Sequence, residues 1–182
     1  MTSYPMRALA LFSLALVVGP AAAQTFAADR GTVTFTSRVP LHSFTGTSGH
    51  LTGEIDTATR AVDFYVDLET LETGIGRRDR DMRETLETDR FPFAEFTGRL
   101  MTPLDLGRRG AQSARVEGTF TLHGVARPMV AVGTIERTDR GLRVRAEWEV
   151  RLDDHRITPP RLLMIKVDPV QAVAIDVLLR PR

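Results

Sequence analysis

The residues that could do chemistry in this chain include four histidines, which are His42, His50, His123 and His155. No two of them stand four residues apart, as they do in the HExxH pattern of zinc proteases. No serine of the chain lies in a GxSxG nucleophile elbow. The spacing predicts histidines on surface loops, and His42 and His50 flank a stretch rich in Gly, Ser and Thr that we expect to be a loop. Two or three of them could still meet in space to bind zinc or copper.

Paired carboxylates are the second candidate for chemistry. Asp79 and Asp81 stand among arginines, as do Asp153 and Asp154. We expect them to be ionised, solvated and paired, whereas a catalytic acid needs burial to raise its pKa. The glycines around Ile75 lack the spacing of either nucleotide-binding fingerprint. These patterns favour no enzyme class, and we expect neither a cofactor nor a metal site.

The N-terminal 23 residues have the order of a secretory signal peptide. Arg7 precedes an apolar run over 8–18, and small residues follow at 21–23. A retained anchor is the alternative, although the apolar run is too short to span a bilayer. We expect cleavage near Ala23, export, and one mature domain over residues 24–182.

Charge and cysteine content exclude further classes of function. Without the first 23 residues the chain has 23 basic and 23 acidic side chains, because Arg7 is the only charge lost. Affinity for phosphate backbones needs an excess of cations, so nucleic acid is not an expected partner. The chain has no cysteine, which rules out disulfides and cysteine-ligated metals.

Alternation of apolar and polar residues recurs along the mature chain and is clearest in GLRVRAEWEVRL, residues 141–152. Such alternation is typical of antiparallel strands with one buried face. It predicts about eight strands, at 32–39, 51–56, 61–69, 93–100, 114–123, 129–137, 141–152 and 170–179, with a turn over 123–128. Eight such strands close naturally into an antiparallel barrel, while a two-sheet sandwich would give a similar pattern.

One charged segment does not alternate. Residues 77–88 favour a short helix, on which Met82 and Leu86 stand four apart and form an apolar stripe. The run Phe91-Pro92-Phe93 then opens the next strand. The simplest interpretation of this segment is a connector.

The inward-facing residues of the strands form the candidate ligand site. A small barrel either fills its interior with side chains or encloses one ligand, and alternation does not distinguish these cases. Val132 is expected to point inward too. The candidate ligand-binding residues are Phe35, Phe64, Val66, Phe96, Phe120, Leu122, Leu142, Val144, Trp148, Val173 and Ile175.

Two blocks of the sequence resemble the YceI-like family. Thr73, the run Arg78–Glu84, Phe91-Pro92 and Phe96 are similar to its "T…RD…P…F" signature, and Val116–Met129 is similar to "V.G.LTLHG.T.P". The resemblance implies a lipocalin-like, all-β antiparallel barrel with a helix near the middle and a periplasmic location. It also implies an apolar tunnel that binds polyisoprenoid or similar amphiphilic lipids, quinone-like molecules among them, and it allows a homodimer.

On this interpretation the charged helix caps the mouth of the barrel. Arg78, Arg80 and Met82 are then candidates for contact with lipid headgroups during transient contact with a membrane. Asp81-Met82 stands where many members of the family have "HL", which leaves the identity of the ligand open.

The resemblance favours a non-catalytic carrier or reservoir for an apolar lipid. Two alternatives remain at this point. One is a barrel enzyme for a hydrophobic small molecule, with His42, His123 or His155 as the base. The other is a filled barrel with a role in interaction or stress.

Overall fold

The computed structural model describes residues 24–182, apart from 40–41, 160 and 163–164. Eight long strands form a closed barrel in the order β1-β10-β7-β6-β5-β4-β3-β2, with every neighbouring pair antiparallel. The strands are β1 Thr25–Val39, β2 His42–Asp56, β3 Ala61–Asp67, β4 Phe93–Leu100, β5 Gly110–Leu122, β6 Val125–Thr138, β7 Gly141–Arg151 and β10 Val170–Pro181.

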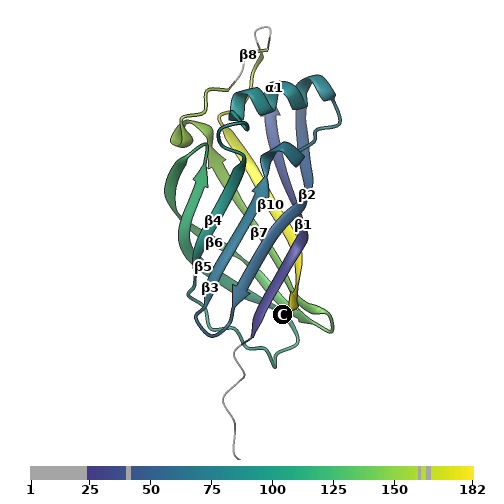
Figure 1. The fold of residues 1–182 in the computed structure, drawn as a ribbon, viewed down its shortest axis with the longest axis vertical. Coiled ribbons are helices and arrows are strands. Elements are labelled where there is room, and N and C mark those ends of the chain that lie inside the picture. Colours follow the sequence, from purple (N-terminus) through teal and green to yellow (C-terminus); the bar gives the residue numbers. More distant parts are fainter. Residues whose placement is uncertain (1–23, 40–41, 160, 163–164) are drawn as a thin grey trace, which may run out of the picture.

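Short elements cluster at one end of the barrel. Helix α1 lies across the upper end in Figure 1, and the C-terminus lies at the lower end. The hairpin of β8 and β9 projects from the same upper end as α1 and was not expected from the sequence. These elements are η1 Leu68–Thr70, α1 Gly76–Leu86, η2 Leu152–His155, β8 Arg161–Leu162 and β9 Ile165–Lys166.

Pairing of the first and last long strands closes the barrel. Phe35 of β1 stands opposite Val173 of β10, and Val173 stands opposite Trp148 of β7. This pairing confirms the predicted antiparallel barrel and excludes the two-sheet sandwich. Because the partners lie far apart in sequence, alternation within single strands could not have shown it.

Both N-terminal strands begin earlier than predicted. The Gly/Ser/Thr-rich stretch after His42 is not a loop but the first half of β2, paired with β1. Its threonines point outward, while Gly46 is buried under the ring of Phe35. The loop prediction was wrong because small polar residues with a two-residue alternation satisfy a strand when an aromatic ring covers the glycine.

The predicted turn over 123–128 is also shorter than expected. Only His123 and Gly124 separate β5 from β6, and both have positive φ angles of 51° and 68°. Two such residues form the two-residue hairpin turn whose twist matches the strands. Similarly, α1 ends at Leu86 rather than Thr88, because Glu87 is left-handed with a φ of 48°.

The lower half of the barrel is filled by a plug of side chains. The residues come from the lower ends of the strands, and each is at most 4% exposed. Leu142 belongs to this plug and does not line the cavity of the upper half. Val132 was predicted to point inward but faces outward and is 54% exposed. On β6 the odd-numbered residues, Met129 and Ala131 among them, face the interior, so the even-numbered Val132 lies on the outer face. The plug consists of Phe26, Ile55, Leu100, Ile135, Leu142, Val177 and Leu179.

Candidate ligand-binding cavity

The upper half of the barrel is hollow. A cavity of about 240 Å³ lies between the plug and α1, and all eight long strands contribute to its wall. One water molecule needs roughly 10–15 Å³ of such space, so the cavity exceeds any ordinary packing defect. Along β7 it extends from Val144 to Val150, which is about 20 Å of strand at roughly 3.3 Å per residue. The cavity is therefore a blind apolar tube.

Of the eleven residues expected to bind a ligand, ten line this cavity and Leu142 does not. Sequence reasoning missed further contributors. Phe44 lies in the stretch of β2 that was expected to be a loop, and its alternation with Gly46 and Ser48 was the available signal. Ile157 and Val167 come from irregular segments at the mouth, where no periodicity could have indicated them.

Two glycines of β2 determine where the phenyl rings of the wall lie. A Cβ atom at Gly46 would come within 2.2 Å of the ring of Phe35. At Gly53 it would come within 2.1 Å of the ring of Phe64. Each ring lies flat against its glycine on the neighbouring strand, so these glycines allow the rings to fold onto the wall. The central space of the barrel stays open as a result.

Helix α1 covers the mouth of the cavity. Met82 and Leu86 pack against the core and line the cavity, as the apolar stripe predicted. Arg78 also lines the mouth, with its guanidinium 4.3 Å from the centre of the Phe44 ring. Arg80 is exposed and is not part of the lining. Of the three candidate mouth residues, Arg78 and Met82 line the cavity and Arg80 does not.

A buried carboxylate fastens the start of α1. Asp79 accepts hydrogen bonds from the backbone N–H of Thr73, at 2.8 Å, and from its hydroxyl. Arg78 donates to the Thr73 hydroxyl at 2.9 Å and to the Thr73 carbonyl at 3.0 Å. Asp79 is thus buried and hydrogen-bonded, not solvated as the sequence suggested. The bond from the Thr73 hydroxyl lowers the pKa of Asp79, and the charges of Arg83 and Arg78 act in the same direction.

We expect this fastening to fail in acid. Because the pKa of Asp79 is lower in the folded protein than in the unfolded chain, its stabilisation is present above about pH 4 and is lost as pH falls through the folded pKa. Asp79→Asn should remove the same stabilisation at neutral pH. The measurement is amide hydrogen exchange, which should become faster over residues 73–86. Asp81→Asn is the control, since no side-chain hydrogen bond of Asp81 exists in the described residues. Equal exchange in both variants would contradict this role of Asp79.

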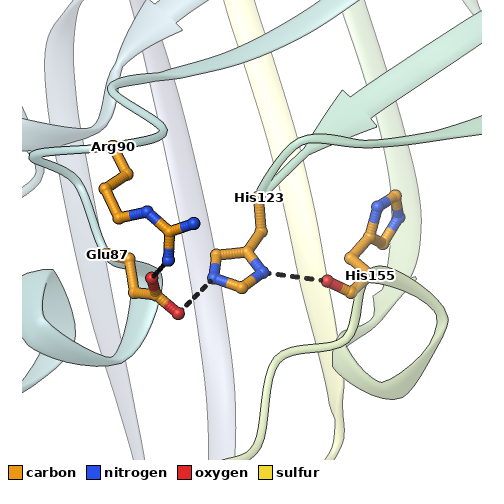
Figure 2. Close-up of polar contacts among 4 residues, drawn as sticks. All are labelled: Glu87, Arg90, His123 and His155. Atoms are coloured by element: carbon orange, nitrogen blue, oxygen red, sulfur yellow. Dashed lines mark hydrogen bonds and ion pairs between the residues drawn. The ribbon is translucent and has the colours of Figure 1, made fainter.

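The histidines near the mouth form hydrogen bonds that join neighbouring elements. His123 lies between two elements (Figure 2), with Nε2 3.1 Å from Oε1 of Glu87 and Nδ1 3.2 Å from the carbonyl oxygen of His155. Arg90 forms an ion pair with the same Glu87, and its hydrogen bond is the main reason that the pKa of Glu87 is lowered. His123 thereby joins the end of α1 to η2 across the β5–β6 turn.

His50 and His155 belong to no metal-binding cluster with His123 in the described residues. His155 is buried, its Nδ1 donates to the carbonyl of Val125 at 3.0 Å, and its ring packs edge-on against Phe120. His50 is exposed on β2, so the histidines are not uniformly on surface loops as predicted. Among the described residues, no histidine lines the cavity and no group of three potential metal ligands occurs. The described part of the chain also has no helix with the length and hydropathy to cross a membrane.

Comparisons with known proteins agree with this architecture. A polyisoprenoid-binding domain from Saccharophagus degradans superimposes with a TM-score of 0.75 at 20% identity, covering 88% of this chain and all of that one. BcnA from Burkholderia cenocepacia gives 0.67 at 11% identity, covering 82% and 94%. The YceI protein of Campylobacter jejuni gives 0.55 at 12% identity, covering 100% and 99%. The TM-scores show a shared fold, and the low identities extend the likeness no further than that.

A sequence comparison assigns the family. No curated protein matches the chain significantly. The family model described as "YceI-like domain" matches residues 25–179, which span the whole barrel from β1 to β10. The chain therefore belongs to the YceI-like family.

Proposed function

We propose that this protein is exported to the periplasm and binds a long apolar lipid with a prenyl chain, without catalysis, as a carrier or reservoir. The observation that supports this most strongly is the blind apolar cavity beneath α1. Cavities with such walls stay dry and accept apolar guests, because water finds too few polar partners in them. The structural relative from Saccharophagus degradans is described as a polyisoprenoid-binding domain, which supports the same class of ligand.

The energetics favour exchange with a membrane over uptake from water. A prenyl tail of roughly 40 carbons gains about 30 kcal/mol on leaving water, at about 0.8 kcal/mol per buried carbon. That value exceeds the strongest non-covalent affinities known. Only the difference in free energy between the bilayer and the cavity therefore counts, and a small difference would permit release. Contact with a membrane and formation of a homodimer stay predictions.

The experiment that tests this function is mass spectrometry of organic extracts from the protein purified out of its exported fraction. We expect a stoichiometric prenyl lipid. Replacing both Phe120 and Trp148 by Gln should abolish its retention, because each change places an amide in the apolar wall. Val132→Gln, on the outer face, is the control and should retain the lipid. Empty wild-type protein, or full retention in the folded double variant, would refute the proposal.

A further inference from the structure

The ladder between β6 and β7 stops halfway up the barrel. Their pairing runs upward from the turn that joins them to Gly133 opposite Ala146, and no pair of described residues continues it toward the mouth. Both strands go on beyond this level, because β6 stays paired with β5 as far as Val125 and β7 stays paired with β10 as far as Arg151. The wall of the hollow half therefore contains a seam, which residues 127–131 of β6 and 148–151 of β7 border.

A proline in the middle of β6 fits this seam. Proline has no N–H to donate, so within sheets it is confined largely to positions where that donor would have no partner. The two-residue turn makes Leu122 and Val125 a hydrogen-bonded pair, and alternation then makes Thr119 and Pro128 a non-bonded pair. The backbone nitrogen of Pro128 thus points away from β5 and toward the seam. A continuous ladder to β7 would have lost a bond at this position.

The seam is tied at both of its ends. The last pair of the ladder, Gly133 with Ala146, closes it below. Above it η2 lies against β6, where Nε of Arg127 donates to the carbonyl of Asp154 at 2.9 Å and His155 donates to the carbonyl of Val125 at 3.0 Å. Between these ties β6 covers about 13 Å, at roughly 3.3 Å per residue. That length is ample for a hydrocarbon chain to pass sideways.

A second ladder that ends early shows how such a gap is closed elsewhere. The pairing of β2 with β3 ends at Thr52 opposite Tyr65. The chain that follows β3 then covers β2, because Thr47 and Glu72 exchange backbone hydrogen bonds of 2.9 and 3.0 Å. Within the described residues, no backbone hydrogen bond of this kind crosses the seam between β6 and β7.

Side chains alone separate the seam from the cavity. Met129 and Ala131 on β6, and Trp148 and Val150 on β7, line the cavity at this level. The ring of Trp148 packs edge-on against Phe120 of β5, with the ring centres 6.3 Å apart. Because β6 lies between β5 and β7, this contact carries the indole across the inner side of the seam. Side chains change rotamer much faster than a ladder opens, so this closure is the weakest part of the wall.

We propose that the seam is a lateral entrance, through which the chain of an apolar lipid passes between β6 and β7 while α1 stays in place. This inference rests on the proposed lipid-binding function. Pro128 and Val130 are exposed and give the β6 border an apolar surface, whereas Glu149 is exposed on the β7 border. The lipid chain would therefore follow β6 and would break no ladder bond. Entry under α1 would instead have to displace a helix that Asp79 fastens.

The test links the two borders of the seam covalently. The chain has no cysteine, so two introduced cysteines can be joined specifically. Val130→Cys with Glu149→Cys places one thiol on each border, and a bis-maleimide with a reducible linker joins them on folded, delipidated mature protein. Thr134→Cys with Arg145→Cys is the matched control, because these residues of the same two strands are already paired below the seam.

Uptake is measured with anthraniloyl-geranylgeraniol supplied in phosphatidylcholine vesicles. Energy transfer from Trp148 reports arrival of the probe, since this residue is the only tryptophan of the chain and lines the cavity. The link across the seam should slow uptake at least about tenfold, because every other route must break hydrogen bonds of the wall or displace α1. Reduction of the linker should restore the rate. The control link should leave uptake at the rate of the wild type.

The outcomes separate this inference from the function beneath it. Equal uptake with and without the link across the seam, or equal slowing by both links, would refute the lateral entrance while lipid binding stands. Asp79→Asn, which should loosen α1, adds a second arm. Faster uptake in that variant, together with undiminished uptake across a linked seam, would place the entrance under α1. If even the unmodified protein takes up no probe after long incubation, the proposed lipid-binding function itself fails.

Discussion

Leu142→Ala is expected to lower the free energy of unfolding by about 4–5 kcal/mol, the upper part of the range for such truncations. Leu142 is completely buried and belongs to the hydrophobic core that forms the plug. Removing three of its carbons leaves a cavity that the closed lower end of the barrel cannot collapse around. The loss therefore contains both the transfer energy of the removed atoms and the cost of the new cavity.

Leu122→Ala is the matched comparison, because the same atoms are removed from the other half of the barrel. Leu122 is also buried, but it borders the open cavity and has no packing partner on that side. We expect a loss of about 2–3 kcal/mol, near the lower end of the range. Urea unfolding of the delipidated protein measures both values. Equal losses would show that the upper half is as tightly packed as the plug.

Gly46→Ala and Gly53→Ala are expected to weaken lipid binding at least tenfold while leaving the fold intact. A methyl group at either position would overlap the ring of Phe35 or Phe64, which must then swing off the wall. The whole ring has to move, by rotation about the Cα–Cβ bond, and the open cavity gives it space to do so. Stability should change little, because alanine is also favoured over glycine in a strand by roughly 0.5–1 kcal/mol. The displaced ring occupies the volume that the lipid needs.

Gly49→Ala provides the control on the same strand. No atom lies within 4 Å of a Cβ at Gly49, so this variant should bind lipid as the wild type does. Lipid content per protein, measured by mass spectrometry of extracts, and melting temperature together test the idea. Undiminished lipid content in Gly46→Ala and Gly53→Ala would show that the rings have another place to go. A large fall in melting temperature would instead show that the rings are held rigidly.

Period-two alternation by itself identifies the strands and most of their inward residues, because it is a local property of each strand. The run from Leu142 to Trp148 is the clearest example, and its even-numbered residues do face the interior. The same kind of local signal places Met82 and Leu86 on the apolar face of a helix. Where no alternation of bulky residues exists, as around Gly46, local reasoning failed.

Which inward residues fill the barrel and which enclose a space depended on contacts between strands distant in sequence. Leu142 and Val144 are neighbours on one face of β7 and look alike in the sequence. One belongs to the plug and the other to the cavity wall, because the lower ends of all the strands bring large side chains to one level. Likewise, Asp79 resembles a solvated surface charge in the sequence, and only the fold brings Thr73 over it. Packing between strands distant in sequence made the first distinction. The second depends on how the chain folds back from Asp79 onto Thr73, a contact between residues only six apart that a periodic pattern does not indicate.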